Sequence, residues 1–153
     1  LIGPSPRYIN EGDYFGGFTT QEIDELIDTL SSNYLGWAAN MAPAIMGNNE
    51  RPELGKELTN SFCKANPEIA KHFARVTFLS DNRDDLASVK VPTLIIQSSE
   101  DVIAPIEVGK YVHENIKNSS FRILEATGHC PNLSAPEETI QVMKDYLEDL
   151  IIA

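Results

Sequence analysis

The 153-residue chain carries 12 Lys and Arg against 23 Asp and Glu, and its net charge of −11 argues against binding to nucleic acid or to an anionic membrane. The composition, 42% apolar and 23% charged, is typical of a globular domain, and no apolar run is long enough to span a membrane. The two cysteines, Cys63 and Cys130, favour reduced thiols and a cytoplasmic location.

The first residues have the pattern of a strand that ends in a loop. Leu1 and Ile2 are apolar and run directly into Gly3 and a pair of prolines. Such a change predicts the end of an extended segment. We therefore expect residues 1–18 to contain the end of a core strand and the connection to a helical region, and we expect further chain ahead of Leu1.

The next part of the chain, residues 19–82, has the periodicity of amphipathic helices and no convincing strand. Thr19 and Glu22 form a capping box before the first helix, and Asn66 before Pro67 predicts the start of the fourth. The apolar stripes of the expected helices are Ile23, Leu26, Ile27 and Leu30; Tyr34, Trp37, Ala38, Met41 and Ile45; Leu54, Leu58 and Phe62; and Ile69, Phe73 and Val76. We predict a layer of four helices.

Residues 83–153 alternate between strand and helix patterns. An apolar run at 91–96 predicts a strand that is buried on both faces, and a polar loop follows at 97–101. Pro105 predicts the start of a helix, and 121–124 predicts a second strand. This βαβ order indicates two parallel strands with a right-handed crossover.

A final helix completes the βαβα unit. Ser134 and Glu137 have the spacing of a capping box before it. The apolar stripe that we expect to face inward consists of Ile140, Met143, Leu147, Leu150 and Ile151. Two parallel strands leave open edges, so we expect the other strands of the sheet to come from a missing N-terminal half.

Two polar side chains follow the predicted strands at their carboxyl ends. Asp101 comes after the first strand and His129 after the second. Because loops at these ends of parallel strands lie on one edge of a sheet, we expect the carboxylate to fix the tautomer of the histidine as a general base. The residues leave alternatives open: Asp101 as a turn residue or helix cap, Glu100 as the acid in its place, and His129 in a turn without a catalytic role.

Six short segments of the chain carry a family resemblance. They are Ser5-Pro6-Arg7-Tyr8, Asp13-Tyr14-Phe15-Gly16-Gly17-Phe18, Asn33-Tyr34 with Trp37, Ser80-Asp81 with Arg83, Val91-Pro92 and Gly128-His129-Cys130-Pro131. In this order they resemble the RsbQ-type α/β-hydrolases, which are kin of the plant strigolactone and karrikin receptor hydrolases. The resemblance implies a partial α/β-hydrolase fold: a four-helix lid over residues 19–82 and the last βαβα of the core over residues 83–153.

The resemblance also implies roles for particular residues. Asp101, four residues before Pro105, matches the aspartate of the catalytic triad, and His129 matches its histidine. In the family the lid roofs an apolar ligand pocket over the triad. The residues that match pocket positions are Trp37, Phe78, Met41, Phe18 and Tyr8. The alternative for each of them is ordinary packing in the core.

The nucleophile of the family is not found in this chain. A serine nucleophile sits in Gly-x-Ser-x-Gly on a turn between strand and helix, and the 153 residues contain no such sequence. Ser5 has only the first glycine and is flanked by prolines, and Ser98 and Ser99 follow the strand that leads to Asp101. We expect the nucleophile and the oxyanion hole to lie in the missing half, and the chain alone to be inactive.

The functional expectation therefore concerns the complete protein. The resemblance implies hydrolysis of a small apolar ester or lactone, or sensing of such a ligand in stress signalling together with a sensor-domain phosphatase. No metal-ligand spacing occurs, and no cofactor is expected. A function of another class stays open, namely a non-catalytic fragment or a binding module that pairs with a separate N-terminal chain.

Overall fold

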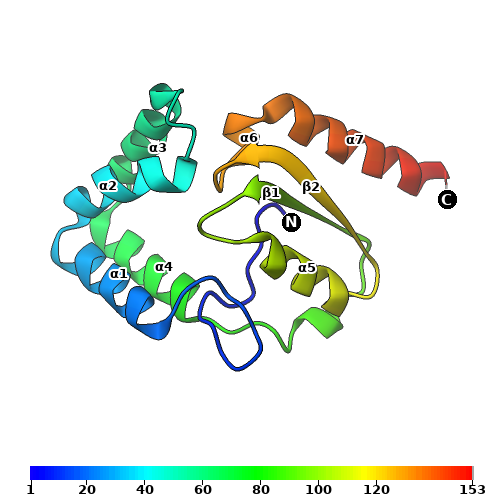
Figure 1. Ribbon diagram of the computed structural model, residues 1–153, viewed down its shortest axis with the longest axis horizontal. Helices are drawn as coiled ribbons and strands as arrows, with labels where there is room; N and C mark the ends of the chain where they lie inside the picture. The colour runs from blue at the N-terminus through cyan, green and yellow to red at the C-terminus, as the bar shows by residue number, and fades with distance from the viewer. Residues whose placement is uncertain (153) are drawn as a thin grey trace.

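The computed structural model describes residues 1–152 and consists of a helical part beside a two-stranded sheet with its own helices (Figure 1). In chain order the elements are α1 (Thr20–Ser32), α2 (Tyr34–Met46), α3 (Pro52–Lys64), α4 (Pro67–Leu79), the 3-10 turn η1 (Leu86–Ser88), β1 (Thr93–Glu100), α5 (Ile106–Asn115), β2 (Ser119–Thr127), α6 (Pro131–Ser134) and α7 (Pro136–Ile152). Over residues 1–152, no helix is both long and apolar enough to cross a membrane.

The helical part begins where the sequence predicts it. Thr19 caps α1 with the complete capping box, and the Asn66 side chain accepts hydrogen bonds from the first backbone N–H groups of α4. The stripes of α1 and α2 are mostly buried as expected, at Ile23, Ile27, Leu30, Tyr34, Trp37, Ala38 and Ile45. The predictions for these two helices are confirmed because one broad apolar face of each packs against the other helices.

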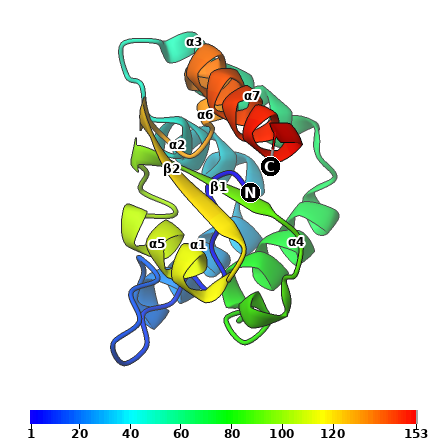
Figure 2. The ribbon, with the colours of Figure 1, turned by 90° about the vertical axis from the view of Figure 1, so that its right-hand side faces the viewer.

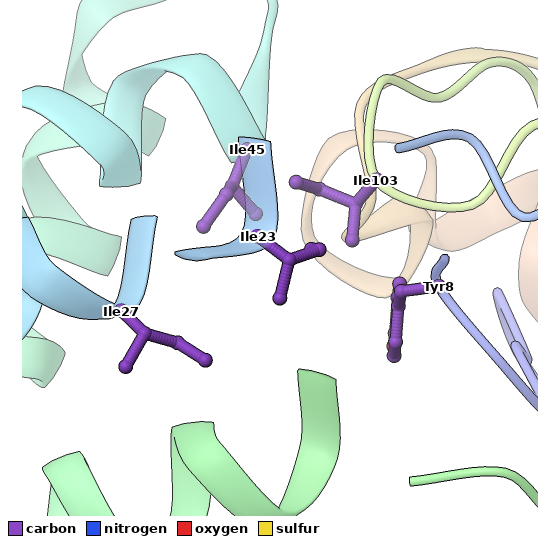
Figure 3. Close-up of a cluster of buried hydrophobic side chains, with 5 residues drawn as sticks. All are labelled: Tyr8, Ile23, Ile27, Ile45 and Ile103. Carbon is purple, nitrogen blue, oxygen red and sulfur yellow. The ribbon is translucent and has the colours of Figure 1, made fainter. Parts of the chain in front are cut away.

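One apolar cluster joins the helical part to the loops of the sheet part. Figure 3 shows Ile23 and Ile27 of α1 and Ile45 of α2 beside Tyr8 and Ile103, and all five are buried. Tyr8 belongs to the segment before α1, and Ile103 to the loop after β1. The loop that follows β1 is therefore packed directly against α1 and α2.

The inward stripe predicted for α4 is wrong. Ile69 and Phe73 are each 70% exposed and Val76 is 56% exposed. Instead α4 packs through Ala74, with Ala70 and Phe78 beside it, against the cluster that contains Trp37. Ala70 and Ala74 are small and lie four positions apart, so they allow α4 to approach α1 closely, and the larger Ile69 and Phe73, one position away, stay largely exposed.

The two strands are parallel, as predicted, with α5 and α7 on opposite faces (Figure 1, Figure 2). The predicted polar loop at 97–101 is wrong at its start, because β1 continues to Glu100. Gln97 pairs with Ile123 and Ser98 with Leu124, and both polar residues are buried in the sheet. The strand pairing of Gln97 and Ser98 with β2 outweighs the low strand preference of their polar side chains.

The first residues lie along the other side of β1. Ile2 forms a parallel bridge with Ile96, and the Gly3 N–H donates to the Ile96 carbonyl at 2.8 Å. The Ile96 N–H donates to the Leu1 carbonyl at 2.9 Å. Ile96 is thus paired on both sides, which places the extended start of the chain beside the strand that leads to Asp101.

The expectations for α7 are also wrong in two respects. Ser134 lies in α6, where its hydroxyl donates to backbone carbonyls, and Glu138 rather than Glu137 makes a backbone contact, with the N–H of Glu125 at 3.1 Å. The stripe predicted to face inward is exposed, at 51% for Ile140, 43% for Met143, 54% for Leu147, 43% for Leu150 and 85% for Ile151. A sheet of two strands is narrow, so α7 packs on it through the neighbouring face of Thr139 and Val142.

Candidate active site

His129 and Asp101 meet at the carboxyl ends of the two strands. Asp101 directly follows β1 and His129 lies two residues after the end of β2, so both leave the same edge of the sheet. The His129 Nδ1 atom lies 2.8 Å from the Asp101 Oδ2 atom. The Asp101 side chain is only 1% exposed, whereas the His129 side chain is 24% exposed. A buried carboxylate therefore holds one nitrogen of a ring that reaches the surface of a cavity.

The Asp101 carboxylate is surrounded by donors. Its Oδ1 accepts from the backbone N–H groups of Ile103 at 2.8 Å and Ala104 at 3.0 Å. Its Oδ2 accepts from the Gln97 amide at 3.2 Å as well as from His129. Donors on both oxygens fix the orientation of a carboxylate group. The arrangement favours a carboxylate that orients the imidazole.

Glu100 occupies a different place from Asp101. It is exposed, and its Oε2 accepts from the Thr127 hydroxyl at 3.1 Å. The contact with His129 is made by Asp101 alone of the two neighbouring acids. Of the two acids that the sequence left open, Asp101 is the one in contact with His129, and its role as the orienting acid stays a prediction.

The histidine loop is held between the end of β1 and the end of α2. The Gly128 N–H donates to the Glu100 carbonyl at 2.7 Å, and the His129 N–H donates to the Ile45 carbonyl at 2.8 Å. Gly128 has a φ of +90°, and a Cβ atom there would lie 1.9 Å from the Met46 carbonyl oxygen. Only glycine allows α2 to approach this closely.

Two side chains after α2 extend this contact, and sequence reasoning missed both. The Asn48 amide donates to the Thr127 carbonyl at 2.8 Å. The Arg51 guanidinium donates to the Asn48 Oδ1 at 2.7 Å and to the Ser134 carbonyl at 2.8 Å. We call this pair the Asn48–Arg51 latch. Its one local signal is the Gly47-Asn48-Asn49 turn, in which Asn48 has a φ of 55°.

Gly3 is a further residue that the sequence did not single out as part of the site. Its φ is +54°, and a Cβ atom at this position would lie 3.0 Å from the His129 Cε1 atom and 3.6 Å from the Asp101 Oδ2 atom. Any side chain here would be strained and would crowd the ring. The only sequence signal was a glycine at the end of the first extended segment.

An apolar cavity of about 530 Å³ opens beside His129. Its lining consists of Tyr8, Leu30, Tyr34, Trp37, Ile45, Leu58, Phe62, Ala65, Ile69, Ala70, Phe73, Ala74, Thr77, Phe78, Ile103, His129 and Cys130. Three of the expected pocket residues, Tyr8, Trp37 and Phe78, are among them. Phe18 and Met41 are not, and they line a separate pocket on the α1 side of Trp37.

Two polar groups of the cavity wall, the Tyr8 phenol and the Cys130 thiol, are held neutral. Burial raises the pKa of the Tyr8 phenol and of the Cys130 thiol, and the charge of nearby Asp101 raises both further. The Trp37 Nε1 is buried and has no hydrogen-bond partner among the described residues. Such a surface suits a ligand that is mostly apolar and carries few acceptors.

None of the serines considered from the sequence forms a hydrogen bond with the imidazole among residues 1–152. The Ser5 hydroxyl donates to the Arg7 carbonyl at 2.9 Å, and the Ser99 hydroxyl donates to the Ala126 carbonyl at 3.2 Å. Ser98 is buried in β1. Within residues 1–152, no group of three His, Cys, Asp or Glu side chains could hold a metal ion. The arrangement consists of an acid, a base and an apolar cavity.

No family model matches the chain. The karrikin insensitive 2 receptor IA of Petunia hybrida is 38% identical over 148 residues, which are 96% of this chain and 54% of that receptor. A strigolactone esterase of Arabidopsis thaliana is 34% identical over 148 residues, which are 96% of this chain and 55% of that esterase. The chain thus spans about half the length of the curated relatives it matches.

A solved structure agrees with these relatives. A hydrolase from Oleispira antarctica is similar with a TM-score of 0.92 and 40% sequence identity, covering 96% of this chain and 54% of the hydrolase. Karrikin and strigolactone receptor hydrolases match in sequence, and hydrolases match in fold. The chain is therefore a homologue of the C-terminal half of the α/β-hydrolases that include the karrikin and strigolactone receptors, and it has the corresponding part of their fold.

Proposed function

We propose that the chain supplies the base and its orienting acid to a serine hydrolase of small apolar esters or lactones. The observation that carries the proposal is the 2.8 Å contact between His129 Nδ1 and Asp101 Oδ2 at the wall of an apolar cavity. Asp101 keeps the proton on Nδ1, so Nε2 is left to accept a proton from a nucleophile and later to return it to the leaving group.

The nucleophile of this reaction comes from outside the 153 residues. The sequence contains no Gly-x-Ser-x-Gly, and the relatives are about twice as long as the region they share with this chain. We use the term assembled hydrolase for this chain together with a segment that carries Gly-x-Ser-x-Gly, on one polypeptide or on two. That segment supplies both the serine and the donors for the oxyanion.

Residues 19–82 act as the lid of this hydrolase in our proposal, and residues 83–153 act as the end of its core. Tyr8, Trp37 and Phe78 contact the apolar part of the ligand, because they line the cavity beside His129. Met41 and Phe18 support the lid rather than touch the ligand, since they pack on the cluster around Ile23.

To test the proposal, the coding sequence ahead of Leu1 is determined, and the polypeptide that it encodes together with this chain is expressed. We expect slow hydrolysis of a nitrophenyl ester by the assembled hydrolase, inhibition by a serine-directed reagent, and none of this turnover in the His129→Ala variant. Retained turnover in that variant, with the same sensitivity to the reagent, would contradict the assignment of the base.

A second function is ligand sensing, in which slow or absent turnover accompanies binding. The observation that favours it is the similarity to karrikin insensitive 2 receptors. From the resemblance to RsbQ-type hydrolases, we propose a sensor-domain phosphatase as the partner and the cytoplasm as the location of the assembled hydrolase. Binding of an apolar lactone should then change the fluorescence of Trp37, the only tryptophan of the chain. A fluorescence change without product release favours sensing, and product release on the same time scale favours hydrolysis.

A further inference from the structure

Gln97 is a fully buried polar residue at the end of the core strand. It lies in β1, four residues before Asp101, and it is 0% exposed. Its amide nitrogen lies 3.2 Å from the Asp101 Oδ2 atom and also contacts the Ala104 carbonyl. One amide group thus links the strand, the acid and the loop that folds around the acid.

The orientation of this amide follows from its neighbours. Both the Asp101 carboxylate and the Ala104 carbonyl are acceptors, so only the NH₂ end of Gln97 can face them. Ala104 in turn donates its own N–H to Asp101 Oδ1 at 3.0 Å. Gln97 and Ala104 therefore hold the two oxygens of the carboxylate from two directions.

Two unfavourable features accompany this placement. The Gln97 Oε1 atom is buried and has no hydrogen-bond partner within the described part of the chain. Gly109 lies inside α5, where glycine weakens a helix, and a Cβ atom at this position would lie 2.9 Å from the same Oε1 atom. The buried Oε1 without a partner is a cost of fitting a full glutamine amide under Asp101, since a small apolar side chain would avoid it. The crowding at Gly109 is shared with the Phe121 ring, whose Cε2 atom would lie 2.8 Å from the same Cβ.

We propose that Gln97 is a positioning residue for the reaction, an inference that rests on the hydrolase function proposed above. Oδ2 of Asp101 accepts from both Gln97 and His129. The Gln97 donor fixes the rotation of the carboxylate, so that Oδ2 stays in line with the ring N–H of His129. Without this donor the carboxylate keeps its backbone contacts through Oδ1 and is free to turn Oδ2 away from the ring.

The experiment compares three variants of the assembled hydrolase. Gln97→Met keeps the approximate volume without a donor, and Gln97→Leu removes the donor with a smaller, branched apolar side chain. Ser98→Ala is the matched control, because Ser98 is the next residue of β1, is 1% exposed, and has a buried hydroxyl without a partner among residues 1–152. The readouts are the proton NMR signal of the His129 Nδ1–H, assigned with His129→Gln, together with kcat and KM.

Both Gln97 variants should lose or broaden the Nδ1–H signal, and kcat should fall about 10- to 100-fold because the base is misplaced. KM should stay within about twofold, since Gln97 does not line the cavity. Ser98→Ala should leave the signal and kcat as in the parent. A parental signal and parental kcat in either folded Gln97 variant overturns the proposal, and Gln97→Leu decides it if Gln97→Met does not fold. If the parent itself has no turnover, the proposed function fails while the NMR signal still decides the role of Gln97.

Discussion

At the scale of single residues, two neighbouring acids have different surroundings. The Asp101 side chain is buried, accepts two backbone N–H groups and contacts His129, whereas the Glu100 side chain is exposed and accepts from the Thr127 hydroxyl. A carboxylate orients an imidazole effectively when its own position is held by other donors. The difference in surroundings therefore predicts a difference in function.

Asp101→Asn in the assembled hydrolase should lower kcat by about 10⁴-fold, because an amide favours the wrong tautomer of His129. Glu100→Gln should change kcat by less than about twofold, since its side chain faces solvent. The measurement is steady-state hydrolysis of a nitrophenyl ester with both variants at equal concentration. Equal losses in the two variants would show that the wrong acid has been assigned.

At the scale of elements, polar contacts join the helical part to the rest at two places. The first is the Asn48–Arg51 latch, which binds the turn after α2 to the histidine loop. The second is an ion cluster of Arg7, Glu11, Asp81 and Arg83, which ties the segment before α1 to the segment after α4. The helical part and the rest of the chain are thereby connected beside His129 and at the two ends of the helical part.

Arg51→Met should loosen the histidine loop. It removes the donors to Asn48 and to the Ser134 carbonyl, which should lower the free energy of unfolding of the assembled hydrolase by about 1–2 kcal/mol. Hydrogen exchange of the His129 amide, which donates to Ile45, should become faster. Arg75→Met on the exposed face of α4 is the control. Unchanged exchange at His129 in a variant that is nevertheless less stable would mean that the latch does not hold the loop.

The ion cluster predicts a dependence of stability on acid. The Arg83 side chain, which bonds to Asp81, lowers the pKa of that carboxyl from 3.8 to about 2. A lowered pKa in the folded state means that the contribution to stability is present above pH 3.8 and is lost as the pH falls towards about 2. In Asp81→Asn, the free energy of unfolding should therefore fall less between pH 3.8 and about 2 than it does in the parent. Urea unfolding at low salt measures this.

Asp84→Asn is the matched control for Asp81, because Asp84 is exposed nearby and forms no ion pair within the described residues. The effect of Asp81 on the free energy of unfolding should shrink in high salt, since the carboxylates of the cluster are 35% exposed at Asp81 and 55% exposed at Glu11, and salt screens their charges. An identical acid profile in both variants would exclude a contribution from the cluster.

At the scale of the whole molecule, the sheet part has a large apolar surface that faces solvent. Met143 and Leu147 of α7 border a groove that Leu1, Ile2 and Pro92 line from the side of β1. Solvent-exposed apolar surface of this kind, next to a strand edge, favours association. The isolated chain should therefore associate, and it should not hydrolyse esters, because it contains no Gly-x-Ser-x-Gly.

Leu147→Glu should weaken this association about 10-fold or more, since it removes one exposed leucine from the contact. Leu35→Glu is the matched control, because Leu35 is 60% exposed on α2, away from the groove. Sedimentation velocity over a range of concentrations measures both variants. Equal weakening by the two substitutions would mean that net charge, and not the α7 surface, controls association.

Local sequence patterns determined much of this protein. The Thr19 capping box, the Asn66 cap before Pro67 and the apolar periodicity of α1 and α2 act within a few residues, so they could be read without the fold. The parallel order of the strands also placed Asp101 and His129 on one edge, because topology restricts where strand ends meet. These are the parts of the fold and of the site that the sequence predicted.

The tertiary structure alone decided the rest. The choice of Asp101 over Glu100, the burial of Gln97 within β1 and the contact of Asn48 with Thr127, 79 positions away, depend on partners that no local pattern specifies. The exposed stripes of α4 and α7 have the same cause, since periodicity shows that a helix has an apolar face but not what covers it. Secondary structure is largely a property of neighbouring residues, whereas burial and hydrogen-bond partners are properties of the assembled chain.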